Sequence, residues 1–161
     1  MQGSRTNDPL RGFPIVSIVN VAWGDLDAFG HVNNTMYFRY FEDARIAWLD
    51  AVGFLGGPPN GIGPILHSTM CRFRQPLKYP DTLRVGTRVA EAAADRLTME
   101  YRIVSGKSNE IAAEGAAVIV AYDYFKGLKV PLPDKVRSRL DMLEKGVEEA
   151  KTARVRPRTR R

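Results

Sequence analysis

A continuous helical pattern occupies residues 34–52, which read NTMYFRYFEDARIAWLDAV. The stretch contains neither Pro nor Gly, and apolar side chains recur at spacings of three and four, at Tyr37, Phe41, Ala44, Trp48 and Ala51. Further apolar side chains occupy other faces, at Phe38, Tyr40, Ile46 and Leu49. A helix that is apolar on most sides must be enclosed by other structure. We therefore expect this helix at the centre of the fold, ended by Gly53.

Strand patterns surround this helix on both sides. One lies at residues 14–23, and four follow the helix near 64–74, 82–93, 96–105 and 110–123, separated by turn signals. Because their connections are short, we expect consecutive strands to be antiparallel neighbours. A second amphipathic helix begins at Asp134. The sequence thus predicts an α+β fold in which one curved antiparallel sheet wraps around the long central helix.

The net charge of +6 is concentrated at one end of the 161-residue chain. Residues 151–161 hold 6 of the 24 basic residues and no acid, which leaves 18 basic against 18 acidic residues in the body. We expect an N-terminal extension over 1–13, one domain over 14–150 and a basic, disordered tail over 151–161. A basic tail can bind RNA or anionic membranes. No RNA-binding motif accompanies it, so we interpret it as a solubilising end without a specific nucleic-acid partner.

Cysteine content and hydropathy bear on the cellular compartment. Cys71 is the only cysteine, which excludes an internal disulfide framework and suits a reducing environment. No apolar run approaches the roughly 20 residues that span a bilayer. The first ten residues are polar and lack the apolar segment of a signal peptide. We expect a cytoplasmic protein with no membrane span.

The loop that leads into the central helix carries the chemical groups. Residues 23–37 read WGDLDAFGHVNNTMY. The first turn of a helix presents unpaired N–H groups and the positive end of the dipole. A thioester carbonyl placed there would gain about 3–4 kcal/mol of oxyanion stabilisation from one donor. Asp27, seven residues before Asn34, could attack that carbonyl or activate water. Alternatively, Asp25, Asp27 and Asn33 serve only as turn formers and caps.

Metal sites and a cysteine nucleophile are poorly supported alternatives. A calcium loop needs oxygen ligands at its fifth and twelfth positions, where this chain has Phe29 and Met36. Zinc would have only His31, His67 and Cys71 as soft ligands, and they lack ligand-pair spacing. Cys71 lies in a strand pattern, which favours a small core residue over a catalytic thiol.

The string Asp-x-Asp-x-x-Gly-His-Val-Asn-Asn-x-x-Tyr, followed by an aromatic-rich helix, resembles the acyl-CoA thioesterases of the hot-dog superfamily. It is most similar to the 4-hydroxybenzoyl-CoA thioesterase group and the related Tol-Pal-associated thioesterases, and the resemblance covers residues 15–140. It implies that Asp27 is the catalytic carboxylate and that the Asn34 N–H polarises the thioester carbonyl. A site histidine of the Tol-Pal branch falls at Asn34, so His31 has either a catalytic or a structural hydrogen-bonding role.

The same resemblance implies a substrate-binding set. Gly30 and Asn33 lie in the loop, and Tyr37 either lines the acyl pocket or packs in the core. Three basic residues fall where relatives bind the phosphates of CoA: Arg96, Lys126 and Lys129. A solvated surface charge is the alternative for each.

The function that we predict is hydrolysis of an acyl-CoA to a free acid and CoA, with Asp27 as nucleophile or general base. We expect no metal or redox cofactor. We also expect a homodimer or homotetramer in which two subunits enclose the acyl chain, because a single sheet leaves open edges that invite pairing. Two alternatives remain, an acyl-ACP thioesterase and a non-catalytic acyl-CoA sensing module, although an intact Asp27 argues against the module. A hot-dog dehydratase is disfavoured, because the loop motifs of those enzymes are absent.

Overall fold

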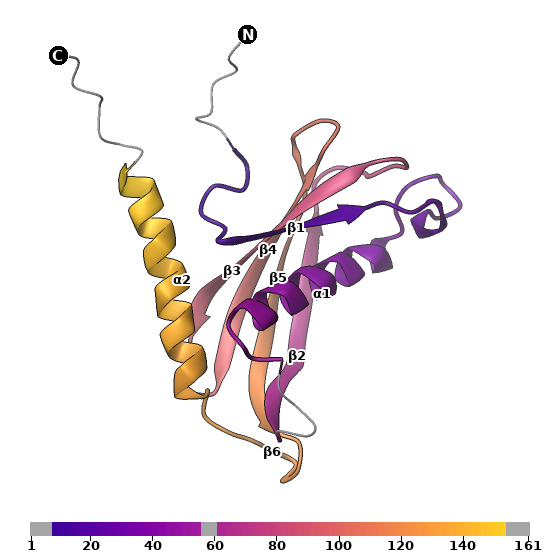
Figure 1. Cartoon of the computed structure of the whole chain (residues 1–161). Helices are drawn as coiled ribbons and strands as arrows, with labels where there is room; N and C mark the ends of the chain where they lie inside the picture. The colour runs from indigo at the N-terminus through magenta and orange to yellow at the C-terminus, as the bar shows by residue number, and fades with distance from the viewer. Residues whose placement is uncertain (1–7, 56–60, 154–161) are drawn as a thin grey trace, which may run out of the picture.

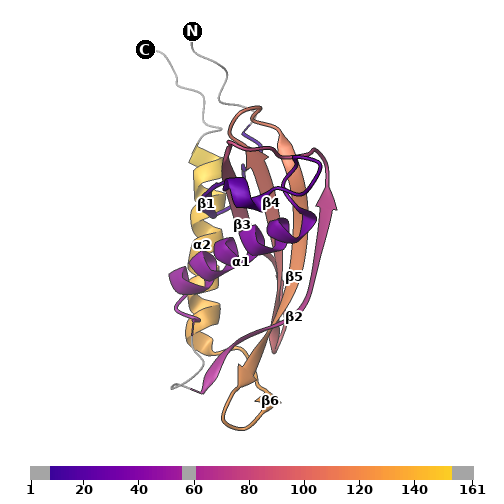
Figure 2. The same cartoon turned by 90° about the vertical axis from the view of Figure 1, so that its right-hand side faces the viewer.

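The computed structural model describes residues 8–55 and 61–153. Its elements are β1 (Ile15–Asn20), the 3-10 turn η1 (Trp23–Asp25), α1 (Asn34–Ala51), β2 (Ile62–Phe73), β3 (Thr82–Ala92), β4 (Arg96–Ser105), β5 (Ile111–Asp123), β6 (Leu128–Lys129) and α2 (Asp134–Ala153). The strands form one antiparallel sheet in the order β1-β3-β4-β5-β2, with the short β6 paired to β5. Helix α1 crosses the concave side of this sheet (Figure 1, Figure 2). The predicted hot-dog fold is therefore confirmed.

The order of the strands differs from the prediction at one connection. β2 and β3 are consecutive in the chain, yet β2 pairs with β5 while β3 pairs with β1 and β4. The expectation that these two strands are neighbours is therefore wrong. Alternating apolar residues define which side of a strand is buried, but they do not specify its partner. The connection 74–81 instead contacts the loop before α1: the Val32 N–H donates to the Leu77 carbonyl at 2.8 Å.

The core lies between α1 and the concave face of the sheet. Phe41 and Trp48 of α1 are fully buried, and the Phe41 ring stacks on Tyr101 of β4 with centroids 4.8 Å apart. Beneath the same ring lies Gly115 of β5, where an added Cβ would come within 2.4 Å of the Phe41 ring. A glycine at this position allows the central helix to approach the sheet closely.

The segment before β1 packs on the opposite face of the sheet. Leu10 and Phe13 fit over Gly86 of β3, where an added Cβ would lie 2.8 Å from each side chain. The guanidinium groups of Arg88 and Arg102 lie 4.8 and 5.2 Å from the centre of the Phe13 ring, within the range of cation–π attraction. The described part of the predicted N-terminal extension is therefore anchored to the domain.

Helix α2 closes the end of the core near the last turn of α1. Its apolar side chains Val136 and Leu140 are buried, and Arg137 donates to the carbonyl oxygens of Ala93 and Ala94 at 2.6 and 2.8 Å. The helix continues to Ala153, three residues into the range predicted as the basic tail, and the division into domain and tail stays a prediction. The remainder of that tail, 154–161, lies outside the described residues. None of the described helices is both long and apolar enough to cross a membrane.

Candidate active site

A short closed loop holds Asp27 in front of α1. The Asp27 N–H donates to the His31 carbonyl at 2.8 Å, and the Gly30 N–H donates to the Asp27 carbonyl at 3.1 Å. Gly30 has φ +75°, a conformation that glycine adopts without strain. Leu26 and Val32 close the loop through an isolated antiparallel bridge. The predicted substrate-binding residue Gly30 thus has a structural role in the turn.

The two carboxylate oxygens of Asp27 have different surroundings. Oδ1 accepts hydrogen bonds from the N–H groups of Phe29 at 2.8 Å and His31 at 3.3 Å. In the described part of the chain, Oδ2 accepts no hydrogen bond. The side chain is half-buried. The alternative interpretation was that Asp27 only forms the turn. That role uses Oδ1, and the same turn orients Oδ2.

Helix α1 begins at Asn34, as predicted, and Asn33 is its N-cap. The Asn33 Oδ1 accepts from the Thr35 N–H at 3.0 Å and from the Thr35 hydroxyl at 2.9 Å. The Asn33 side-chain oxygen is thus occupied by the cap. Within residues 8–55 and 61–153, the N–H of Asn34 has no hydrogen-bond partner. An open donor at the positive end of the helix dipole therefore follows Asp27 by seven residues.

Tyr37 lies at the inner wall of this region. It is buried, and its ring packs edge-on against Phe73 of β2 with centroids 4.9 Å apart. Burial raises the pKa of the Tyr37 phenol, a backbone hydrogen bond from Leu77 lowers it, and the nearby Cys71 and Asp27 raise it further. Burial also raises the pKa of the Cys71 thiol to about 11. Cys71 therefore stays a neutral thiol at neutral pH.

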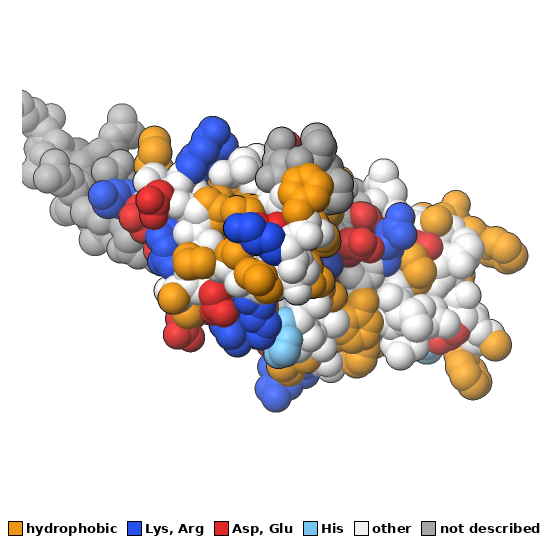
Figure 3. All heavy atoms as spheres, turned by 90° about the horizontal axis from the view of Figure 1, so that it is seen from below, with side chains coloured by type: hydrophobic (Ala, Val, Ile, Leu, Met, Phe, Trp, Pro, Cys, Tyr) orange, Lys and Arg blue, Asp and Glu red, His pale blue; other side chains and the backbone are white. Residues whose placement is uncertain are grey.

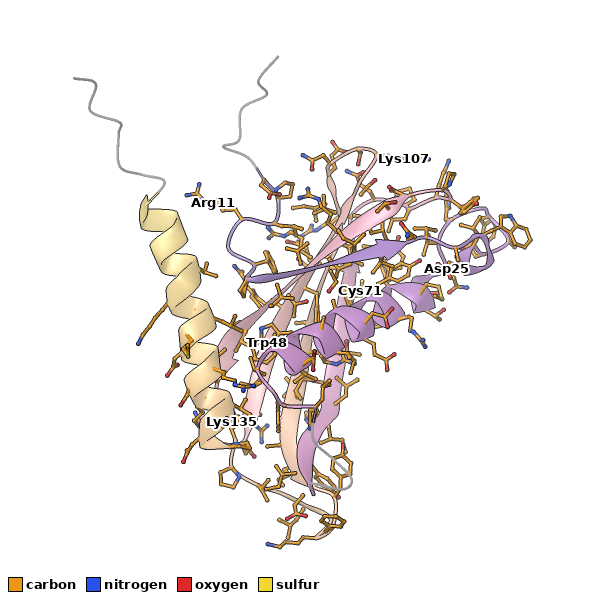
Figure 4. The ribbon with its side chains drawn as sticks, viewed as in Figure 1. Arg11, Asp25, Trp48, Cys71, Lys107 and Lys135 are labelled. Carbon is orange, nitrogen blue, oxygen red and sulfur yellow. The ribbon has the colours of Figure 1, made fainter. Side chains whose placement is uncertain are left out.

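Two features of the loop were not predicted from the sequence. The Asp25 Oδ2 accepts from the Tyr40 hydroxyl at 2.7 Å and from the Ala22 N–H at 2.9 Å, and Figure 4 shows Asp25 beside the first turns of α1. The sequence did contain a sign of the Asp25 contact: Tyr40 lies on a helix that was predicted to be buried, and a buried tyrosine hydroxyl needs a hydrogen-bond partner. The second feature is a pair of exposed aromatic side chains on the loop: Trp23 is 74% exposed and Phe29 85%.

The three predicted phosphate-binding residues lie at the other end of the sheet. Arg96 begins β4 and donates twice to Asp95, at 2.8 and 3.2 Å. Lys126 lies 3.8 Å from Asp123, and Lys129 is on β6. Figure 1 shows β6 far from the loop that precedes α1, and Figure 3 shows that basic and acidic side chains are interspersed at the β6 end. A single chain therefore does not bring these residues to Asp27.

The groups around Asp27 suit one kind of reaction. Among the residues that the structure describes, a half-buried carboxylate with one oxygen free of hydrogen bonds lies before a helix whose first N–H has no partner. Such a carboxylate can attack a carbonyl carbon or activate water to attack it, while the N–H stabilises the oxyanion that develops. Across the described residues, no three His, Cys, Asp or Glu side chains gather closely enough to hold a metal ion.

Sequence comparison identifies the family. The profile of the thioesterase-like superfamily matches residues 21–140, which includes the Asp27 loop and the whole sheet from β2 onward. The chain belongs to this superfamily. It is therefore a thioester hydrolase, and the suspected hot-dog thioesterase relationship is confirmed.

Solved thioesterase structures agree with this assignment over most of the chain. A thioesterase from Thermus thermophilus, solved in complex with coenzyme A and zinc, is 30% identical and superposes with a TM-score of 0.73. The match covers 83% of this chain and 97% of that protein. A thioesterase superfamily protein from Jannaschia sp. CCS1 is 26% identical, with a TM-score of 0.75 over 81% of this chain and 82% of that one.

One curated relative acts on a different carrier. The chloroplastic acyl-acyl carrier protein thioesterase ATL3 of Arabidopsis thaliana is 27% identical over 117 residues, which are 71% of this chain and 61% of that protein. The chain is thus similar both to a thioesterase solved with coenzyme A and to one named for acyl carrier protein. The identity of the carrier is consequently a separate question from the reaction.

Proposed function

We propose that the protein hydrolyses an acyl-CoA to the free acid and CoA, with Asp27 as the catalytic carboxylate. The observation that carries the proposal is the Asp27 Oδ2, which no described residue pairs, in a loop that leads directly to the Asn34 N–H, likewise without a partner among the described residues. The coenzyme A complex of the Thermus thermophilus relative supports CoA as the carrier.

In this mechanism the thioester carbonyl accepts a hydrogen bond from the Asn34 N–H, which is worth about 3–4 kcal/mol to the transition state. The Asp27 Oδ2 then acts in one of two ways. As a nucleophile, it bonds to the carbonyl carbon and expels CoA as a thiolate, and water cleaves the resulting anhydride. As a general base, it takes a proton from the water that attacks the carbonyl. After a single turnover in H₂¹⁸O, ¹⁸O in the Asp27 carboxylate would establish the nucleophilic route, because only that route can place it there, by attack of water on the aspartyl carbonyl of the anhydride.

We also propose that the active form contains at least two subunits. In the described part of the chain β2 pairs with β5 alone, so its other edge offers free backbone groups. Apolar side chains along this strand are exposed, among them Leu66, Met70 and Phe73. Pairing of β2 with its copy across a twofold axis would cover them and place the partner beside Tyr37. We expect light scattering to give twice the chain mass or more, whereas a fully active monomer would contradict this proposal.

A second carrier is favoured by a specific observation. Arg96 and Lys126, which were predicted to bind the CoA phosphates, lie far from Asp27 within one chain, and both contact acidic side chains. The Arabidopsis relative is named for acyl carrier protein. An acyl-ACP substrate is therefore the second candidate, with the same chemistry at Asp27.

The test is thiol release from a panel of short, medium, long and aromatic acyl thioesters, each presented on CoA and on acyl carrier protein. We expect hydrolysis of one acyl class, with kcat/KM at least tenfold higher on CoA than on the carrier protein. The reverse preference would identify acyl-ACP as the substrate. Tight binding of an acyl-CoA without hydrolysis on either carrier would refute the enzymatic proposal and favour a sensing module.

A further inference from the structure

Within the described part of the chain, one side-chain hydrogen bond attaches the loop that carries Asp27 to the body of α1. The Tyr40 hydroxyl donates to the Asp25 Oδ2 at 2.7 Å, across 15 positions of sequence. Among the described residues, no other side-chain hydrogen bond joins residues 22–33 to α1 beyond its first turn. This contact thus joins the loop to the second turn of the helix, in addition to the backbone hydrogen bonds that Val32 makes to Leu77 and Asn33 makes to Asp25.

Asp25 also connects the other parts of the loop. Its Oδ2 accepts from the Ala22 N–H at 2.9 Å, and its backbone carbonyl accepts from the N–H of Asn33 at 2.8 Å. Asn33 is the residue that caps α1. One residue therefore contacts the end of the β1 segment, the helix cap and the second turn of the helix.

Tyr40 provides a rigid point of attachment. It is 2% exposed, and its ring lies 6.3 Å from that of Tyr37. It is six residues after Asn34, about 9 Å along the helix axis. Burial and the hydrogen bond to Asp25 both raise the pKa of the Tyr40 phenol, so the hydroxyl remains a donor throughout the pH range of an assay.

We propose that Asp25 and Tyr40 are a positioning pair, which fixes the loop so that Asp27 faces the carbonyl bound at the start of α1. Asp27 follows Asp25 by two residues, so a shift of Asp25 is transmitted directly to the reacting carboxylate. Neither residue touches the substrate in this proposal. The inference rests on the proposed catalytic role of Asp27. A displacement of about 1 Å between reacting groups can cost about 10²-fold in rate.

The experiment is steady-state kinetics of Tyr40→Phe on the best thioester of the panel. We expect kcat to fall about 10–100-fold while KM changes by less than about threefold, because orientation is lost and substrate contacts are kept. Tyr101→Phe is the matched control, since it also removes a buried tyrosine hydroxyl, one that contacts Arg45 on another part of α1. A kcat for Tyr40→Phe within twofold of this control would overturn the proposal.

A second pair of variants keeps the test decisive if Tyr40→Phe folds poorly. The amide oxygen of Asp25→Asn can still accept from the Tyr40 hydroxyl, whereas Asp25→Ala removes the acceptor. We expect Asp25→Asn to retain most of kcat, Asp25→Ala to lose as much as Tyr40→Phe, and the double variant Asp25→Ala/Tyr40→Phe to lose little more. Equal kcat values for the two Asp25 variants would refute the pair.

Asp27→Asn in the same assay separates this inference from the proposed function. An inactive Asp27→Asn beside a normal Tyr40→Phe would overturn the positioning role alone. An active Asp27→Asn would remove Asp27 from the mechanism and the positioning role with it. Loss of kcat in both variants supports both proposals.

Discussion

Asp27→Asn is expected to lower kcat about 10²–10⁴-fold on the best thioester, the range that a positioned carboxylate contributes. The asparagine Oδ1 can still accept from the N–H groups of Phe29 and His31, which now reach Asp27 at 2.8 and 3.3 Å. The turn is therefore preserved. The Oδ2 becomes an amide nitrogen, which is neither a nucleophile nor a base. Thiol-release kinetics and the melting temperature of the same sample measure the two effects separately.

Asp43→Asn provides the matched control for this variant. Asp43 is an exposed carboxylate on α1, 3.6 Å from Arg39, with more than half of its side chain in solvent. Exposed ion pairs of this kind contribute little to stability, so kcat and the melting temperature should both stay near the wild-type values. If Asp27→Asn kept a kcat within about threefold of Asp43→Asn, the carboxylate would have no catalytic role.

The sequence predicted the centre of the fold correctly because one helix carried most of the signal. The pattern over 34–52 has no helix breaker and several aromatic residues, and the structure places α1 at Asn34–Ala51 inside the sheet. Strand existence followed from alternation, and the bounds of β2 to β5 lie within two residues of those predicted. The partner of each strand in the sheet could not be predicted from this alternation. The position of β2 beside β5 depends on contacts between residues that are 40 or more positions apart in the chain.

Only part of the candidate site could likewise be predicted from the sequence. Asp27 and the start of α1 are adjacent in the chain, so a local motif was sufficient to propose them together. Arg96 and Lys126 were assigned by resemblance, and the structure places them at the far end of the sheet. The Asp25–Tyr40 hydrogen bond joins residues 15 positions apart. Its two members look like an ordinary turn former and an ordinary apolar-face residue, so only the folded geometry reveals the contact.

Replacement of Trp48 should produce the largest loss of stability. The side chain is fully buried near the end of α1 that approaches α2 (Figure 4). It borders a cavity of about 380 Å³ whose other walls include Leu140 and Leu143 of α2. Removing a large aromatic side chain from such a core costs about 3–5 kcal/mol. That is a large share of the roughly 5–15 kcal/mol that is typical of a whole domain.

Trp48→Ala and Trp48→Phe together test how this residue contributes. Among the described residues the indole Nε1 of Trp48 is buried without a hydrogen-bond partner, and an unpaired buried donor costs about 1–3 kcal/mol. Trp48→Phe keeps an aromatic ring and removes that donor, so it should lose clearly less stability than Trp48→Ala. Denaturant unfolding at one fixed protein concentration measures both, since any oligomer makes stability depend on concentration.

Met142→Ala is the control for these variants, because Met142 is an apolar side chain of α2 that is 72% exposed. Its replacement should change the free energy of unfolding by less than about 0.5 kcal/mol. If Trp48→Ala were as stable as Met142→Ala, α1 would not be enclosed by the sheet and α2. The Asn34 N–H at the start of α1 would then lack a fixed place, because burial of α1 side chains such as Phe41 and Trp48 is what holds the helix in position.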